Sequence, residues 1–257
     1  MGDFFSPEEL MTVTAARCVG NDDVCFVGIG LPSAACNLAR LTHAPEITLI
    51  YESGTINARP RVLPLSIGDG ELCTTALATV SVPEFFRYWL QGGRITVGFL
   101  GAAQIDRFAN LNTTVVGSYE SPSVRLPGAG GAPEMAASCQ RIFIVMPHSK
   151  RAMVAKLDFL TSLGHGEGGD ARARHGIGTA GPVKLITDLC VMQPDAVTRE
   201  LTVTSVHPGV TRDRIQAATG WTVRFAEQVT ETAAPSSNEL DVLRRLKADT
   251  ERAHQRA

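Results

Sequence analysis

Short, continuous apolar runs alternate with segments of helical spacing along the first 150 residues. Residues 6–20 place apolar side chains at helical spacing after Ser6-Pro7-Glu8-Glu9, which predicts a helix capped by Ser6. The apolar runs are too short for helices and do not alternate with polar residues, which is typical of strands buried on both faces of a parallel sheet. The alternation predicts an α/β fold, an open, mostly parallel sheet with flanking helices. The predicted strands are residues 24–27, 47–50, 95–100 and 142–146, and the further helices begin near residues 31, 82 and 133.

The pattern changes beyond residue 148. Residues 161–182 are rich in glycine and predict a long loop, which inside a compact domain is usually functional or mobile. Residues 184–187 and 201–204 alternate as antiparallel or edge strands do. Thr211 is expected to cap a short helix that closes at Gly220. Asn238 is expected to cap a final helix over 239–255, docked through Leu240, Val242 and Leu246.

Length and charge narrow the possibilities. A chain of 257 residues fits one large α/β domain or two small ones, and we predict a single domain over 1–257 with a peripheral C-terminal helix at 238–256. The net charge of −2 provides no basic field that would favour nucleic acid or an anionic membrane. Because no apolar run reaches about 18 residues, no membrane span is expected.

The cysteines and the N-terminus predict a cytoplasmic protein. The six cysteines form no CxxC pair and most lie in apolar segments, as buried, reduced thiols do. Residues 1–5 lack a basic region followed by an apolar one, so no secretion signal is expected.

Common catalytic and cofactor signatures are absent. The sequence has no nucleotide P-loop, no HExxH and no GxSxG. Gly28-Ile29-Gly30 shares two glycines with the dinucleotide fingerprint, but Ser33 stands where the third belongs. This segment therefore predicts a tight strand-to-helix turn, whose N–H groups can still face an anion or an acyl oxygen. The histidines do not cluster, so no metal site is expected; His148 and His207 are interpreted as structural.

Two weak features remain. Glu52 follows the strand at 47–50, and the carboxyl ends of strands form the ligand crevice of open α/β sheets. A glutamate held there can act as a nucleophile or a general base. The cluster Gly128-Ala129-Gly130-Gly131-Ala132 can direct backbone N–H groups at a ligand as an oxyanion or phosphate cradle.

Taken together, five motifs resemble the β subunit of class I CoA-transferases, especially the glutaconate-type branch. They are residues 26–32, 51–54, 101–106 with 110–112, 125–132, and 206–210 with 219–221. The resemblance implies the NagB/RpiA/CoA-transferase-like fold. It also implies that Glu52 is the catalytic glutamate and that Gly128 through Ala132 line the thioester and CoA site. Within the family, the chain is interpreted as most similar to the β subunit of the IpdAB-type enzyme, which opens the last steroid ring of a CoA thioester by hydrolysis.

Three functions therefore stay open. The leading prediction is ring-opening hydrolysis of a cyclic β-keto CoA thioester in steroid degradation, in which a carboxylate activates water. The alternative is CoA transfer between dicarboxylic acids, in which Glu52 attacks the thioester and forms an anhydride, then a glutamyl-CoA thioester. A third, from another class, is a non-catalytic acyl-CoA-binding subunit. In either reaction, backbone N–H groups near Gly130 and Gly131 could stabilise the thioester oxygen by about 3 kcal/mol per donor.

The resemblance also implies partners and a site. A separate α subunit is expected, in an α2β2 assembly, with coenzyme A entering only as part of the substrate and no permanently bound cofactor. The expected site comprises the catalytic residue Glu52; oxyanion and CoA-binding residues Gly28, Gly30, Gly128, Gly130, Gly131 and Ala132; and substrate-pocket residues Tyr51, Ser53 and Asn57.

Overall fold

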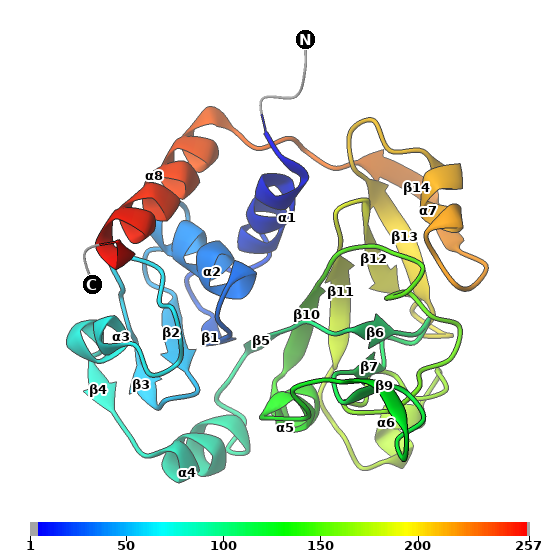
Figure 1. Ribbon diagram of the computed structural model, residues 1–257, viewed down its shortest axis with the longest axis horizontal. Helices are drawn as coiled ribbons and strands as arrows, with labels where there is room; N and C mark the ends of the chain where they lie inside the picture. The colour runs from blue at the N-terminus through cyan, green and yellow to red at the C-terminus, as the bar shows by residue number, and fades with distance from the viewer. Residues whose placement is uncertain (1–4, 256–257) are drawn as a thin grey trace. The chain divides into compact units, whose positions relative to one another are not determined.

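The computed structural model describes residues 5–255 and divides into two compact units (Figure 1). Unit 1 runs to Phe99 and resumes at Ala234, and unit 2 spans Leu100–Ala233. The prediction of one domain over 1–257 stays a prediction. Two predictions fall outside the described residues. The expected lack of a secretion signal concerns residues 1–5, of which only Phe5 is described, and the predicted end of the last helix is Arg256, which is not described. No described helix is long and apolar enough to cross a membrane.

Unit 1 is built on five strands in the order β5 (Val97–Leu100), β1 (Val24–Val27), β2 (Thr48–Tyr51), β3 (Thr55–Ile56) and β4 (Ala78–Thr79). β1 pairs in parallel with both β2 and β5, while β3 and β4 add an antiparallel edge. The side chains of β1 and β2 are buried on both faces, which explains their continuous apolar runs.

The helices of unit 1 begin largely as the sequence predicts. α1 (Pro7–Ala16) starts with a capping box in which Ser6 and Glu9 bind each other's backbone N–H. It ends before residue 20 because Cys18 and Val19 close three-residue turns instead. The other helices are α2 (Leu31–Leu41), α3 (Gly70–Thr75), α4 (Val82–Glu84) with the π-helical turn η1 (Phe85–Leu90), and α8 (Ser237–His254).

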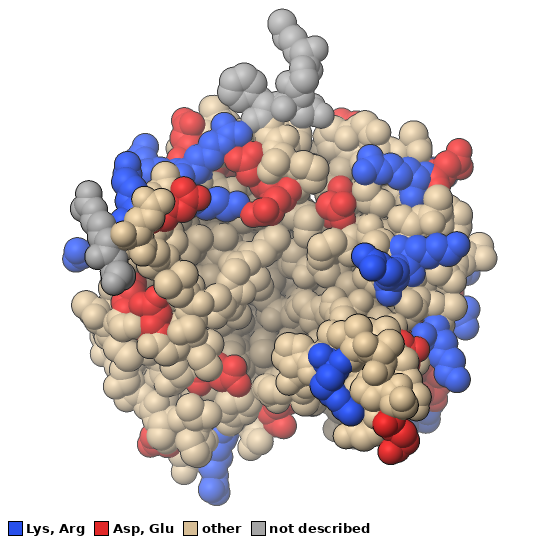
Figure 2. All heavy atoms as spheres, in the orientation of Figure 1, with Lys and Arg blue, Asp and Glu red and all other residues tan. Residues whose placement is uncertain are grey.

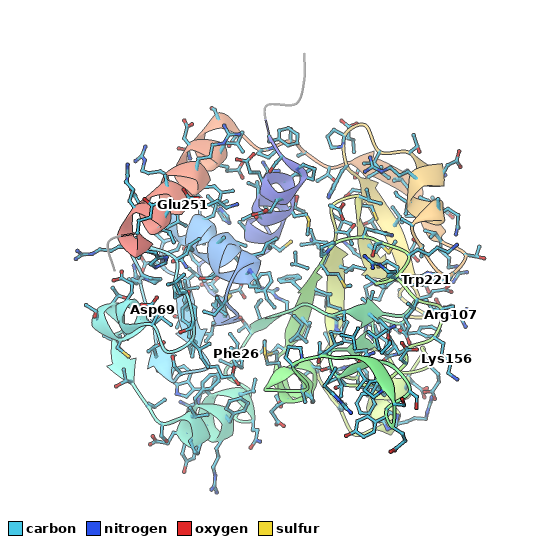
Figure 3. The ribbon with its side chains drawn as sticks, viewed as in Figure 1. Phe26, Asp69, Arg107, Lys156, Trp221 and Glu251 are labelled. Carbon is cyan, nitrogen blue, oxygen red and sulfur yellow. The ribbon has the colours of Figure 1, made fainter. Side chains whose placement is uncertain are left out.

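The aromatic-rich turn η1 reaches the core through Phe85 and Leu90, whereas Tyr88 is exposed. Phe85 on η1 is fully buried and meets the ring of Phe26 edge-on, with centroids 4.7 Å apart. Phe26 lies on β1, as labelled in Figure 3. Edge-to-face packing of this kind adds to the apolar burial that anchors η1 on the sheet.

The C-terminal helix differs from the prediction in its cap and its buried face. Ser236, not Asn238, caps α8, because Ser236 and Glu239 have the spacing of a capping box. The buried face is Leu240, Leu243 and Leu246, at helical spacing, whereas Val242 is only half-buried. The helix packs on α1 and α2.

Ion pairs tie α8 to α1 across the outer surface of unit 1. Arg17 binds both carboxylate oxygens of Glu239, at 2.8 and 2.6 Å, and Arg244 binds Glu9. Charges of both signs accordingly mix over these helices (Figure 2). Burial alone would raise the pKa of Glu239, but hydrogen bonds from Arg17 and Ser236 outweigh it and lower that pKa to about 2.

Unit 2 contains a second run of five strands, in the order β14 (Arg224–Glu231), β13 (Leu201–Val206), β12 (Cys190–Pro194), β11 (Pro182–Ile186) and β10 (Arg141–Val145). β11, β12 and β13 are antiparallel, as the alternation around 184–187 and 201–204 predicts, while β10–β11 and β13–β14 are parallel. Neither β12 nor β14 is predicted by the sequence pattern. Two short hairpins complete the strands of the unit: β6 (Gln104–Ile105) with β7 (Leu111–Asn112), and β8 (Val115–Gly117) with β9 (Pro122–Arg125). Its helices are α5 (Ala132–Ser138), α6 (Ala171–Arg174) and α7 (Arg212–Ala217). The predicted α/β class is confirmed.

A buried polar cluster in unit 2 accounts for two of the histidines. His148 binds Thr187 Oγ1 through Nδ1 (3.1 Å) and Thr219 Oγ1 through Nε2 (2.9 Å). His207 binds Thr232 Oγ1 through Nδ1 (2.9 Å) and the Thr187 carbonyl through Nε2 (2.7 Å). All four imidazole nitrogens therefore have partners, which supports the structural interpretation of these residues.

Candidate active site

Glu52 lies in a tight turn directly after β2. The backbone N–H of Gly54 donates to the Tyr51 carbonyl at 2.9 Å, so Glu52 and Ser53 occupy the centre of the turn between β2 and β3. Gly54 has φ 88°, and a Cβ there would lie 2.0 Å from the Val80 carbonyl oxygen, so only glycine fits. The Glu52 side chain is half-buried, and no described residue pairs with its carboxylate.

The predicted glycine turn at 28–30 lies next to this carboxylate in the sheet. β1 and β2 are parallel and Val27 pairs with Tyr51, so Gly28 and Glu52 leave neighbouring strands at the same edge. Gly30 (φ 82°) is the N-cap of α2 and provides no side-chain cap. The N-terminus of an 11-residue helix thus follows directly, with backbone N–H groups suited to an anion.

Tyr51 fastens α2 to β2. Its side chain is fully buried, and its hydroxyl lies 3.0 Å from Ser33 Oγ and 3.2 Å from the donating Nδ2 of Asn37. Burial raises the pKa of Tyr51 to about 12, so the phenol stays neutral. These contacts give Tyr51 a positioning role behind Glu52, and its predicted place in a substrate pocket stays a prediction.

Unpaired polar atoms concentrate in the segment that carries Glu52. Ser53 Oγ, Thr55 Oγ1 and Asn57 Oδ1 are buried and have no hydrogen-bond partner. Asn57 also has a left-handed backbone, with φ 50°. Because a buried polar atom without a partner costs about 1–3 kcal/mol, three of them within five residues indicate a segment whose partners come from outside the chain. Sequence reasoning singled out Ser53 and Asn57 but missed Thr55, since pairing is invisible in a sequence.

The second predicted cradle lies in unit 2. Thr113 anchors the start of this loop with two hydrogen bonds. Its hydroxyl donates to the Gly128 carbonyl (2.8 Å), and its carbonyl accepts from the Gly128 N–H (2.9 Å). Gly128 and Gly130 have positive φ angles of 98° and 50°. The N–H groups of Gly130 and Gly131 donate to no other described residue, while Ala132 N–H closes a turn onto Ala129. The loop therefore offers two unused donors, as an oxyanion cradle requires.

The predicted site residues thus fall into two groups. Gly28, Gly30, Glu52 and Ser53 gather at the carboxyl edge of β1 and β2 in unit 1. Asn57 lies further back along β2, because it follows the antiparallel strand β3, in which Ile56 pairs with Ile50. Residues 128–132 form a loop of unit 2. Among the described residues, no group of three or more His, Cys, Asp or Glu side chains could hold a metal ion.

Comparison with known proteins identifies relatives along the whole chain. A family model described as coenzyme A transferase matches residues 8–218. The chain is 62% identical to the B subunit of 3-oxoadipate CoA-transferase from Pseudomonas knackmussii, over 97% of this chain and 96% of that protein. It is 31% identical to the B subunit of glutaconate CoA-transferase from Acidaminococcus fermentans, over 95% and 94%. The cholesterol ring-cleaving hydrolase IpdB subunit of Mycobacterium tuberculosis is 25% identical, over 83% and 82%.

A solved structure confirms the fold. Glutaconate coenzyme A-transferase from Acidaminococcus fermentans superposes with a TM-score of 0.88 at 29% identity, covering 94% of each chain. The predicted fold, with its large, mostly parallel sheet, is therefore confirmed. The similarities favour the transferase alternative over the leading steroid-ring prediction, since two transferase subunits are 62% and 31% identical to the chain and the IpdB subunit only 25%.

Proposed function

The chain belongs to the coenzyme A transferase family, and we propose that it is the β subunit of a heteromeric CoA-transferase whose nucleophile is Glu52. The observation that carries this proposal is the similarity along nearly the whole chain to one subunit of 3-oxoadipate CoA-transferase. It points to a dicarboxylic acid with a 3-oxo group as the acceptor. Because that relative is one of the subunits of its enzyme, an α subunit of the same family is the proposed partner.

The geometry at Glu52 suits a nucleophile. Its carboxylate is held at a strand end by the Tyr51–Gly54 turn and is not neutralised by any described cation. A carboxylate that must attack a carbonyl carbon needs free oxygen lone pairs, which a salt bridge would occupy. The tight turn fixes the backbone, so attack is not delayed by ordering of the segment.

The proposed reaction proceeds in balanced steps. A Glu52 oxygen attacks the thioester carbonyl carbon of the donor, the C–S bond breaks, and CoA leaves as a thiolate from an acyl-glutamyl anhydride. The thiolate then attacks the Glu52 carbonyl carbon and expels the donor acid as a carboxylate, leaving a glutamyl-CoA thioester. The acceptor carboxylate attacks this thioester and the same two steps run in reverse, so CoA is transferred and Glu52 is regenerated.

Backbone donors are proposed to carry the developing charge. Each tetrahedral intermediate places a negative charge on the former carbonyl oxygen. The N–H groups at the start of α2, which follows the strand beside β2 in unit 1, are the donors proposed for this charge. The unused N–H groups of Gly130 and Gly131 in unit 2 remain a separate proposed cradle. One well-placed donor of this kind is worth about 3 kcal/mol.

The test is a transfer assay on the complex with its α subunit. With succinyl-CoA as the donor and 3-oxoadipate as the acceptor, we expect stoichiometric 3-oxoadipyl-CoA and succinate by liquid chromatography. Glu52→Gln should abolish the product, whereas Glu46→Gln, which removes an exposed carboxylate before β2, should not. Free CoA in place of transfer, or unchanged turnover in Glu52→Gln, would overturn the proposal.

The ring-opening hydrolase remains the second candidate, on the strength of the similarity to the IpdB subunit. The two reactions differ in the fate of water. When the reaction is run in water labelled with oxygen-18, a transferase leaves both products unlabelled, whereas a hydrolase incorporates the label into its product. A non-catalytic binding role predicts neither reaction in any variant.

A further inference from the structure

A buried arginine, Arg172 on α6, anchors the glycine-rich segment over residues 161–182. The five N–H groups of Arg172 donate only to neutral oxygens, among them Gly164 O (2.8 Å), Ala136 O (2.9 Å) and Thr179 Oγ1 (2.7 Å). Gly181 passes so close that a Cβ would lie 2.6 Å from Arg172 Cζ. The expectation of a functional or mobile loop stays a prediction, and the hydrogen bonds of Arg172 show how the segment is anchored within unit 2.

The 161–182 segment lines a cavity of about 660 Å³. All lining residues belong to unit 2, and the turn at 194–199 contributes some of them. The volume is in the range of small-molecule sites, which is about 300–1,000 Å³. Ile177, Val183 and Val197 supply apolar walls, and Val197 is 80% exposed despite its apolar side chain. The cavity therefore has room and surface for a small organic molecule with an apolar body.

The charge of this cavity is unbalanced. Arg172 is 7% exposed and has no carboxylate partner. Arg199 lines the same cavity without an ion pair to any described residue. The one acid in the lining, Asp170, binds Arg174 instead. Because a buried cation without a counter-charge is costly, the cavity favours an anion. Arg199 closes the turn between β12 and β13 with a left-handed backbone (φ 63°), and its N–H donates to the Asp195 carbonyl.

One buried side chain in the cavity has an unused hydrogen-bonding atom. His165 is 3% exposed, and its Nε2 lies 2.7 Å from the Pro182 carbonyl, which can only accept, so Nε2 carries the hydrogen. Burial lowers the pKa of His165, and the charges of Arg172 and Arg199 lower it further against the bond to Pro182, so the ring is neutral. Nδ1 is then an acceptor, and no described residue donates to it.

The geometry points to a second ligand site in this cavity, for a small organic acid that carries a hydroxyl or amide donor and an apolar body. The carboxylate would bind Arg199 in the field of Arg172, the donor would reach His165 Nδ1, and the apolar body would cover Val197. This site does not depend on the proposed transferase function, since its residues include none of those assigned to the reaction.

Binding to the purified chain tests the site without any catalytic readout. 3-Hydroxyhexanoate is the probe, measured by titration calorimetry and by the nitrogen NMR shift of His165 Nδ1. Hexanoate lacks the donor and should bind about two- to tenfold more weakly, and 1,3-hexanediol lacks the charge and should bind roughly tenfold or more weakly.

Matched variants identify the residues. Arg199→Asn removes the cation and tolerates the left-handed backbone, so it should weaken 3-hydroxyhexanoate binding roughly tenfold to a hundredfold. His165→Phe keeps a ring of similar size but removes the Nδ1 acceptor, and should erase the preference over hexanoate while hexanoate itself still binds. Arg214→Gln, the same loss of charge on exposed α7, should bind normally. No saturable binding, or equal binding by Arg199→Asn and Arg214→Gln, would overturn the assignment.

Discussion

The Glu52 segment of unit 1 and the histidine cluster of unit 2 are both buried and polar, yet they treat their polar atoms in opposite ways. Around His148 and His207 every imidazole nitrogen has a partner. In residues 52–57 the Glu52 carboxylate and three buried side-chain oxygens have none. A cluster whose polar atoms are all hydrogen-bonded stabilises the fold, whereas polar atoms without partners remain able to bind a group from outside the chain. Whether buried polar atoms have hydrogen-bond partners therefore distinguishes structural residues from candidate site residues better than residue type does.

The largest expected effect is at Glu52. Glu52→Gln keeps the size of the side chain but removes the nucleophile, so transfer should fall by at least about 10⁴-fold, as loss of a nucleophile does elsewhere. Since the carboxylate makes no pairing within the described chain, the melting temperature should not fall. Assays of turnover and thermal unfolding on the same preparation check both parts. A large loss of stability would place Glu52 in the scaffold instead.

A pair of threonines sharpens the comparison. Thr187 Oγ1 accepts from Leu189 N–H and Cys190 N–H and lies 3.1 Å from His148 Nδ1. Thr187→Val leaves these groups unpaired and should cost about 2–4 kcal/mol of unfolding free energy. Thr55 is equally buried, at 1% exposed, but its hydroxyl has no partner.

Thr55→Val should therefore leave the unfolding free energy unchanged or raise it by up to about 1 kcal/mol. It should lower kcat/KM up to about tenfold, because the missing partner is supplied in the working complex. Urea titration of both variants decides the matter. Equal destabilisation by Thr55→Val and Thr187→Val would break the comparison.

The smallest expected effect concerns a glutamate of unit 1 that is fully paired. The pKa of Glu239 is lowered to about 2 in the fold by Arg17 and Ser236, against the effect of burial. Its stabilisation is therefore complete above the ordinary value near 4.5 and is lost as the pH falls toward 2.

Glu239→Gln should cost about 1–2 kcal/mol at pH 7 and flatten the decline of stability between pH 4.5 and 2. Chemical denaturation across that window measures it, with Asp241→Asn, an exposed neighbour on α8, as the control. If both variants show the same pH profile, Arg17–Glu239 contributes nothing to the docking of α8.

Local signals in the sequence predicted much of unit 1. Ser6 caps α1 as expected, and the apolar runs at 24–27 and 47–50 became buried parallel strands. In unit 2, Thr211 caps α7 as expected. The cap of α8 was misplaced by two residues because both Ser236 and Asn238 are good caps and only the reciprocal contact of Glu239 distinguishes them. β14 was missed because its residues are mostly exposed and carry little periodic signal.

The site could be predicted only in outline. Glu52 and the loop at 128–132 were singled out from their places after a strand and in a glycine cluster, and from resemblance. The unpaired atoms of Ser53, Thr55 and Asn57 depend on tertiary packing, as does the burial of Arg172. The leading prediction was steroid-ring hydrolysis rather than CoA transfer, because the segment around Glu52 suits either reaction and only whole-chain similarity favours transfer.

The most direct test of Glu52 as the nucleophile is to trap it. The complex with the α subunit is incubated with succinyl-CoA alone, treated with borohydride or hydroxylamine, and digested for mass spectrometry. The account predicts a modification on the peptide that contains Glu52, dependent on succinyl-CoA and absent in Glu52→Gln. An unmodified Glu52 peptide in an enzyme that still transfers CoA would contradict it.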